Sequence, residues 1–154
     1  MKKLEKMLWE GIHGNDLRKV ALALNLGADV NTKEKSGMSP LHRARSVTIA
    51  ELLISAGADV NSKGYKGRSP LHWEILCNNT AIAELFMSSG ADVNTKDNDG
   101  ESPLHGAVWI YDVALAELLI SAGADVSVKD KLGRSPLDYA NSEEMKELLQ
   151  GVTP

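Results

Sequence analysis

Short apolar stripes at helical spacing alternate with polar turns along the chain. In each stripe the apolar residues fall three or four positions apart, which places them on one face of a helix. The stripes in the middle of the chain are Ile49, Leu52 and Leu53; Ile82, Leu85 and Phe86; and Leu115, Leu118 and Leu119. Two more open the chain: Leu4, Met7, Leu8 and Ile12, then Leu17, Val20, Ala21 and Leu24. The pattern predicts short helices in pairs, and one such pair cannot cover its own apolar face.

Two sequence phrases recur in register with these stripes. The first reads Ser-Pro-Leu-His, or Ser-Pro-Leu-Asp in its last copy, and its copies begin at Ser39, Ser69, Ser102 and Ser135. The second reads Gly-Ala-Asp-Val-Asn, or Gly-Ala-Asp-Val-Ser in its last copy, and its copies begin at Gly27, Gly57, Gly90 and Gly123. Both advance in steps of 30, 33 and 33 residues. Two phrases that share a period near 33 indicate a stacked repeat array.

The phrases also indicate where the helices begin and end. Serine is a favoured N-cap and proline suits the first helical position, so Ser-Pro starts the first helix of a pair. The phrase glycine supplies the positive φ that ends the second helix. We expect one domain over residues 1–154, with segments 1–32, 33–62, 63–95, 96–128 and 129–151. The first and last segments carry the polar residues that the end caps of a stack need.

The segment 33–62 is three residues shorter than the next two. Ser39 and Gly57 are 18 residues apart, against 21 residues in the two segments that follow. The missing residues fall where the first helix turns into the second, and the last segment is short as well. We expect first helices over 40–45, 70–78 and 103–110, and a final helix over 143–150. The shortened segment 33–62 is predicted to be the least stable layer, because a truncated helix pair offers less interface.

Together, these features resemble the ankyrin repeat: a turn, a Ser-Pro-Leu-His helix start, a second helix that ends in Leu-Leu-x-x-Gly-Ala-Asp-Val-Asn, and a period of 33. The resemblance covers nearly the whole chain, as an N-terminal cap, three central repeats and a C-terminal cap. It implies an all-α repeat solenoid of stacked helix–turn–helix units with projecting β-hairpin-like fingers. It also implies a non-enzymatic protein that binds other proteins on the concave face made by the fingers and the first helices.

Composition narrows the classes of function. The formal net charge of -4 argues against a nucleic-acid surface, which usually carries a basic stripe. No stretch approaches the roughly 20 apolar residues of a membrane span. Glu5, Lys6 and Glu10 break the apolar run that a signal peptide needs. Cys77 is the only cysteine, so no intrachain disulfide can form, and we expect a reducing setting. Together with the broken signal-peptide pattern, this favours the cytoplasm. We also expect a monomer. Secretion as an effector stays open.

The repeated histidines do not have the spacing of a metal site. His42, His72 and His105 lie 30 and 33 residues apart and have no second ligand close by in sequence. The resemblance implies a structural role, in which each imidazole bonds the backbone and the serine hydroxyl of its own phrase. The serines concerned are Ser39, Ser69 and Ser102. In the same way, Asn31, Asn61 and Asn94 are expected to satisfy backbone groups; hydroxylation, known for some relatives, is the less favoured role.

Catalytic chemistry has no motif to carry it. The chain has no nucleophile elbow, phosphate loop or paired-histidine helix. The resemblance places Cys77 at an outward-facing, variable helix position, and no fixed histidine neighbour can be argued for it, so we expect an inert thiol. The loop Thr95–Gly100 resembles a calcium loop only faintly, because Thr95 and Gly106 stand where an EF-hand needs acids. We expect no enzyme, no metal and no cofactor.

The resemblance places partner contacts beside the turn glycines and at the ends of the first helices. The finger positions are Lys35, Ser36, Met38, Tyr65, Lys66, Arg68, Asn98, Asp99, Glu101, Lys131, Leu132 and Arg134; the helix-end positions are Leu76, Cys77, Trp109 and Ile110. Tyr65 and Trp109 are the strongest candidates, because exposed aromatic residues commonly anchor interfaces. For Trp109, packing on a neighbouring helix is an equal alternative.

Two residues of the third segment depart from the other repeats. Trp73 stands where a bulky apolar residue is common, so packing is its favoured role. Glu74 replaces the alanine found at Ala44 and Ala107, and its carboxylate needs a partner or water. Glu74 therefore marks either a binding groove or a local departure from the repeat.

Two functions of different class remain open. The first is a stand-alone module that binds one protein partner through the concave face. The second is the targeting or accessory part of a bacterial effector or enzyme system, with the array as scaffold. The chain starts at Met1 and ends at Pro154, shortly after the last cap, which favours the first function.

Overall fold

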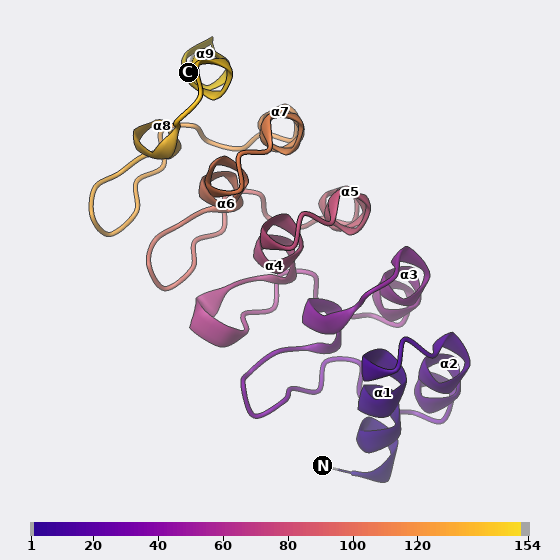
Figure 1. Cartoon of the computed structure of the whole chain (residues 1–154). Coiled ribbons are helices and arrows are strands. Elements are labelled where there is room, and N and C mark those ends of the chain that lie inside the picture. Colours follow the sequence, from indigo (N-terminus) through magenta and orange to yellow (C-terminus); the bar gives the residue numbers. More distant parts are fainter. Residues whose placement is uncertain (1, 152–154) are drawn as a thin grey trace.

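The helices form layers stacked in chain order, each a pair of antiparallel helices (Figure 1). The structure is a computed structural model that describes residues 2–151. The pairs are α1 (Lys3–His13) with α2 (Leu17–Asn25), η1 (Pro40–Arg43) with α3 (Val47–Ser55), α4 (Pro70–Leu76) with α5 (Thr80–Ser88), α6 (Pro103–Trp109) with α7 (Val113–Ser121), and α8 (Pro136–Tyr139) with α9 (Glu143–Gly151). No β-strand occurs within residues 2–151, which confirms the predicted all-α repeat solenoid.

The loops between layers project beyond the row of first helices, on the side away from the second helices (Figure 1). We call these loops the fingers; they span residues 33–39, 63–69, 96–102 and 129–135. Backbone bonds within each loop close the finger, for example from the Gly64 N–H to the Arg68 carbonyl at 2.8 Å. The predicted β-hairpin-like form of the fingers is not confirmed, because no strand occurs within residues 2–151. A short 3₁₀ turn, η2 (Tyr65–Gly67), shapes the second finger.

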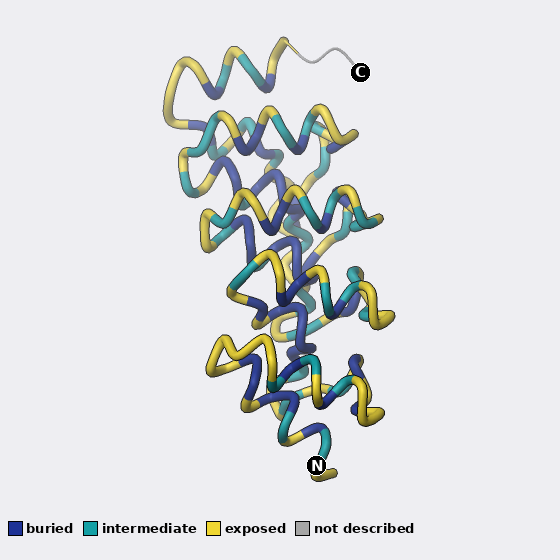
Figure 2. Tube along the Cα trace, turned by 90° about the vertical axis from the view of Figure 1, so that its right-hand side faces the viewer, coloured by how far each residue is buried: buried dark blue, intermediate teal, exposed yellow. Residues whose placement is uncertain are grey.

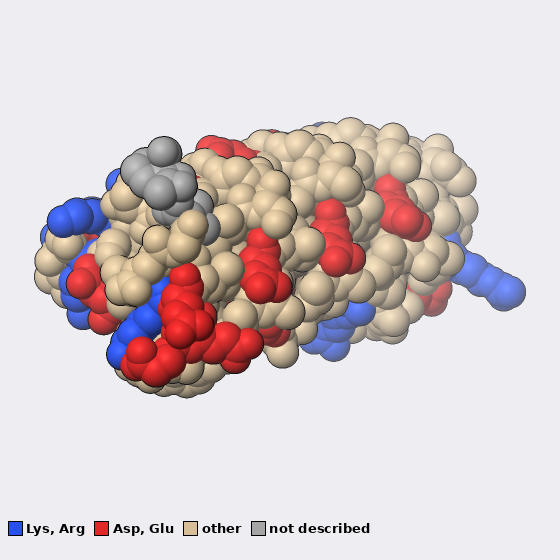
Figure 3. All heavy atoms as spheres, turned by 90° about the horizontal axis from the view of Figure 1, so that it is seen from above, with Lys and Arg blue, Asp and Glu red and all other residues tan. Residues whose placement is uncertain are grey.

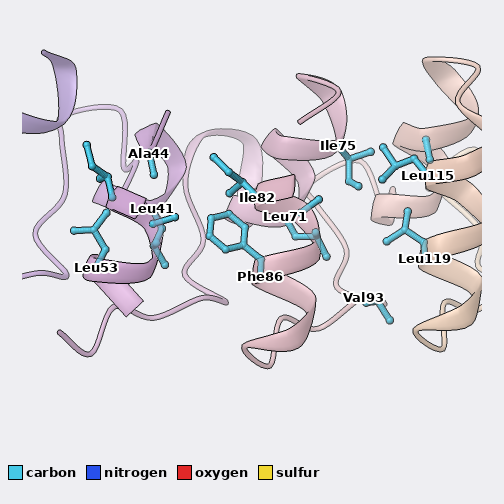
Figure 4. Close-up of a cluster of buried hydrophobic side chains, with 14 of the residues drawn as sticks. Leu41, Ala44, Leu53, Leu71, Ile75, Ile82, Phe86, Val93, Leu115 and Leu119 are labelled. Carbon is cyan, nitrogen blue, oxygen red and sulfur yellow. The ribbon is translucent and has the colours of Figure 1, made fainter. Parts of the chain in front are cut away.

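The apolar stripes meet between layers, as their spacing predicts. The last residue of each second-helix stripe, Leu53, Phe86 or Leu119, is fully buried, whereas the leucine before it is only partly buried. Figure 4 shows these side chains facing those of the first helices and of the next layer. Figure 2 shows buried and exposed positions alternating along the second helices. Burial of one such side chain stabilises the stack by roughly 1.5–3 kcal/mol.

The Ser-Pro-Leu-His phrase both caps a helix and ties one layer to the next. The Ser69 N–H donates to His72 Nδ1 at 3.2 Å, so the other ring nitrogen, Nε2, carries the proton in the neutral imidazole. Nε2 donates to the Glu101 carbonyl of the next finger at 3.1 Å. Burial lowers the pKa of His72 to about 4, which keeps the ring neutral at pH 7. His42 and His105 make the equivalent bonds to the fingers that follow them.

The asparagines form a second connection between layers. Asn31 Nδ2 donates to the Gly57 carbonyl at 3.1 Å, and its Oδ1 accepts from the Asp59 N–H at 2.8 Å. Asn61 and Asn94 repeat both bonds one layer further along. The asparagines satisfy backbone groups, as predicted, but those groups belong to the following layer.

Several predicted helix ends need correction. The first helix expected over 40–45 is the four-residue 3₁₀ turn η1, because Ala44 is already extended and Ser46 must cap α3. The helices expected over 70–78 and 103–110 end at Leu76 and Trp109. The final helix extends one residue further than expected, to Gly151. Among the described helices, none has the length and apolar character needed to cross a bilayer.

Candidate partner-binding surface

The second finger presents Tyr65 and Lys66 to solvent. Both side chains are exposed, and the Lys66 ammonium lies 5.9 Å from the centre of the Tyr65 ring. Gly64 makes this finger different, because a Cβ there would lie 2.9 Å from the sulfur of Met38. Met38 is buried, and its sulfur accepts the Tyr65 N–H at 3.4 Å. Met38 is therefore not available as a partner contact, and that prediction is wrong: its side chain fills the space beside Gly64.

Arg68 and Glu101 are predicted contacts that already bind each other. Arg68 Nε donates to Asp97 Oδ2 at 3.0 Å, and its Nη2 lies 3.7 Å from Glu101 Oε2. The guanidinium also lies 5.9 Å from the centre of the Trp73 ring. Burial raises the pKa of Glu101, and the nearby Asp97 carboxylate adds to that effect. These side chains hold two fingers together, which leaves only part of each surface for a partner.

The tips of the other fingers are exposed. Asn98 and Asp99 follow the Asp97 side chain, whose Oδ1 accepts the Asp99 N–H at 2.9 Å and so shapes the turn. The Asn98 N–H donates to the Lys66 carbonyl at 2.9 Å, which fixes one finger against the next. Exposed side chains of the first and last fingers are Lys35, Ser36, Lys131, Leu132 and Arg134.

Three aromatic side chains gather where α6 meets α8. We call Trp109, Tyr111 and Tyr139 the aromatic patch; they line a cavity of about 230 Å³ together with Asn141. Trp109 is 55% exposed and Tyr111 is 65% exposed. The rings of Trp109 and Tyr139 are 5.7 Å apart, so Trp109 both packs on a neighbouring helix and faces solvent. Arg134 of the last finger lies 4.5 Å from the Tyr139 ring and joins the patch to the fingers.

Tyr111 stands in a backbone conformation that bulky residues rarely adopt. Its φ is 59°, in the left-handed region, at the turn between α6 and α7. The equivalent residues of two other layers, Asn15 and Asn78, have φ values of 51° and 54°. Asparagine tolerates this region well, whereas a tyrosine there is strained. Tyr111 is not among the contacts predicted from the sequence, although a tyrosine at a turn position that is asparagine in two other layers is a visible signal.

The remaining helix-end candidates lie near the ends of α4 and α6. Cys77 is exposed, while Leu76 and Ile110 are partly buried. Burial raises the pKa of the Cys77 thiol, and the charge of Glu74 adds to that effect. The thiol is therefore in its protonated, weakly nucleophilic form at neutral pH.

A larger cavity lies beside the shortened layer. We call it the short-layer cavity, and its volume is about 420 Å³. Its lining residues are His42, Arg43, Ala44, Arg45, Trp73, Glu74, Cys77 and Asn79. Glu74 is only 5% exposed, and its carboxylate forms no ion pair within residues 2–151. Burial raises the pKa of Glu74 to about 7, and the Asn79 amide lowers it in part.

Both cavities have the same origin in the sequence. The residues that the shortened second segment lacks correspond to 76–78 of the third segment, and the last segment lacks the same three. The short-layer cavity lies against η1, and the aromatic patch lies against α8, which are the two shortened first helices. Each missing helical turn exposes the side of the full-length helix in the adjacent layer.

Two further surface features are a row of exposed glutamates on the second helices and a cavity at the end of the stack. One exposed glutamate recurs on each of α3, α5, α7 and α9: Glu51, Glu84, Glu117 and Glu147. Figure 3 shows acidic groups spaced along a largely uncharged face. An open cavity of about 520 Å³ at the end of the stack lies between Lys3 and Leu26. No group of three or more histidine, cysteine or acidic residues in the described part could hold a metal ion.

Comparison with known proteins gives one family. A family model described as "Ankyrin repeats (3 copies)" matches residues 8–97, 44–130 and 71–152. These overlapping stretches extend over most of the 154 residues. No curated protein gives a significant match.

Proposed function

The chain belongs to the ankyrin repeat family, and from that premise we propose that it binds a protein partner through the concave face formed by its fingers and first helices. Ankyrin repeats are in general protein–protein interaction modules, and the family is typically non-enzymatic. The proposed contacts are Tyr65, Lys66, Asn98 and Asp99 on the fingers, and Trp109 and Ile110 at the end of α6. Arg68, Glu101 and Cys77 contribute the parts of their surfaces that remain accessible.

The aromatic patch is the observation that carries this proposal. Large aromatic side chains that stay exposed are typical interface anchors, because they bury much apolar area at low entropic cost. Trp109 and Tyr111 are each more than half exposed, and Arg134 connects them to the fingers through Tyr139. A strained tyrosine at position 111 is a cost to the fold that a binding role explains.

Affinity capture with paired variants tests the proposal. The bait is the full chain, beside a Trp109→Ala/Tyr111→Asn variant in which the patch loses two of its aromatic rings. The control is a Glu84→Ala/Glu117→Ala variant, which alters exposed residues of the second helices. We expect a protein that the wild type and the control capture and the patch variant loses, with a loss of affinity of at least tenfold in a direct titration.

Two results would contradict this proposal. One is equal capture by the patch variant and the wild type, with a loss of capture by the glutamate control, which would move the binding face to the second helices. The other is a captured partner that protects neither the fingers nor the aromatic patch from hydrogen exchange. All three proteins must melt well above the assay temperature, so that a loss of capture reports the surface and not unfolding.

A further inference from the structure

We propose that the short-layer cavity receives one basic side chain of the protein partner, whose cationic head pairs with the Glu74 carboxylate beside the Trp73 ring. This inference rests on the proposed function and names the chemistry of one contact within it. Of the predicted finger and helix-end positions, only Cys77 lines this cavity.

The cavity exists because of a sequence feature of this chain. The three residues missing after Arg45 shorten the first helix of the second layer to η1. The side of α4 that a full-length helix would cover then borders a space of about 420 Å³. That volume is ample for a lysine or arginine side chain, and the opening faces solvent between two layers.

Glu74 gives the cavity its selectivity. The second, fourth and fifth layers carry alanine at this position, at Ala44, Ala107 and Ala140, and each of these alanines is buried. A buried carboxylate without a cation is unfavourable, so a residue of this kind inside a cavity points to a ligand that supplies the charge. The raised pKa of Glu74 agrees, because burial causes it and no basic side chain opposes it.

Arg43 and Arg45 also line the cavity, but neither forms an ion pair with Glu74, whose polar neighbour is the Asn79 amide. Arg43 is directed toward the first finger, where its Nη2 lies 3.4 Å from Glu34 Oε2. Arg45 is exposed and has no ion pair within the described residues. His42 is neutral at pH 7, because burial lowers its pKa, and its Nε2 donates to the Arg68 carbonyl.

Trp73 supplies an aromatic wall for the same occupant. Its ring lines the cavity and lies 5.9 Å from the Arg68 guanidinium, which agrees with the attraction of cationic groups to an indole ring. Its Nε1 is buried and has no hydrogen-bond partner in the part of the chain that the structure describes. An aromatic wall beside a buried carboxylate suits a side chain with an apolar stem and a cationic end, which describes lysine and arginine.

A titration with small amides tests this inference without the partner. The probe is Nα-acetyl-lysine methylamide added to the isotope-labelled full chain, with the arginine amide as a second probe. The neutral norleucine amide has nearly the same shape as the lysine amide and serves as the control ligand. We expect saturable shifts of the Trp73 indole N–H and of the amides of residues 74–79 with the basic amides, and none with norleucine.

Two variants separate charge from shape. Glu74→Gln keeps the volume of the side chain and removes the charge, so affinity for the basic amides should fall at least tenfold. Glu74→Ala matches the other layers and should give the same loss in a well-folded protein. Binding by the wild type should be tighter at pH 8 than at pH 6, because the carboxylate is then ionised.

The outcomes separate this inference from the proposed function. Equal shifts with the norleucine amide, unchanged affinity in Glu74→Gln, or no saturable shift at 50-fold or greater ligand excess would overturn the cavity's role. Capture of the partner by Glu74→Gln as well as by wild type would also overturn it, while the proposed function would stand. Loss of capture only in the aromatic-patch variant, together with charge-dependent amide binding, would support both.

Discussion

Tyr111 links a local strain to the proposed binding surface. Its left-handed backbone is the conformation that Asn15 and Asn78 adopt at the same turn of other layers. We expect Tyr111→Asn to raise the free energy of unfolding by about 0.5–1 kcal/mol, because asparagine occupies this region at a lower cost. Denaturant titration of the variant beside the wild type measures this difference.

The reverse substitution provides the control. Asn78→Tyr places a tyrosine at the equivalent turn of the third layer, and it should lower stability by a similar amount. If Tyr111→Asn proved less stable than the wild type, the contacts of the tyrosine ring with the patch would outweigh the backbone strain. Position 111 would then be structural, and the strain would lose its value as a sign of binding.

Glu74 makes stability depend on pH. Its pKa is about 7 in the folded chain and 4.5 in the unfolded chain, so folding takes up a proton between these values. The stability that the folded chain gains from this proton on Glu74 is fully present below pH 4.5 and is lost as the pH rises through 7. The free energy of unfolding of the wild type should therefore fall, relative to that of Glu74→Gln, by up to about 3 kcal/mol as the pH rises from 4.5 to 8.

His72 has the opposite dependence and cancels in this comparison. Its pKa is lowered from 6.5 to about 4 on folding, so its stabilisation is present above pH 6.5 and is lost as pH falls through 4. Because both proteins keep His72, the difference between them isolates Glu74. A difference that stays constant between pH 4.5 and 8 would show that Glu74 ionises freely in the folded chain.

At the scale of the element, the shortened second layer differs most from its neighbours. Its first helix is the four-residue turn η1, against seven residues in α4 and in α6. We expect the amides of η1 and α3 to exchange at least tenfold faster than those of α4 and α5, because fewer helical bonds and less apolar contact oppose local opening. Native-state hydrogen exchange with residue resolution measures this.

An insertion provides the matching test. Adding Leu-Ser-Asn after Arg45 restores the length of the other central layers. The insertion copies Leu76-Cys77-Asn78 with serine in place of the cysteine. The added helical turn should raise stability by about 1 kcal/mol and slow exchange in α3. Exchange in the second layer that is already as slow as in the third would contradict the prediction of a weak layer.

The sequence predicts the helices well where their boundaries have a local chemical cause. Ser69-Pro70 starts a first helix, and Gly90 ends a second helix, in the structure as in the pattern. The 3₁₀ turn η1 escaped prediction because its cause is not local: three missing residues bring the cap of α3 too close for an α-helix. A spacing in the sequence shows the deletion but not the conformation that accommodates it.

The candidate surface is less predictable for the same reason. Met38 and Glu101 occupy equivalent finger positions, yet Met38 is buried and Glu101 is only partly covered. The difference depends on Gly64, a residue of the next layer, which leaves room for the Met38 side chain. Contacts between layers are invisible in the pattern of a single repeat. The aromatic patch likewise combines residues from two layers.

At the scale of the whole molecule, each layer contacts only its neighbours, so stability is a sum over layers and interfaces. The weak second layer then divides the stack, with α1 and α2 on one side and the layers from α4 onward on the other. The tryptophans report on both sides, because Trp9 lies in α1, Trp73 in α4 and Trp109 in α6. A local destabilisation should therefore stay on its own side of the division.

Two matched core substitutions test this division. Leu8 and Leu119 are both fully buried, and Leu→Ala at such sites costs about 2–5 kcal/mol. In proteins with a single tryptophan, Leu8→Ala should move the denaturant midpoint of Trp9 well below that of Trp109. Leu119→Ala should move the midpoint of Trp109 more than that of Trp9. Coincident midpoints in both variants would mean that the interfaces are strong enough to make the stack one cooperative unit, and the second layer would then not act as a boundary.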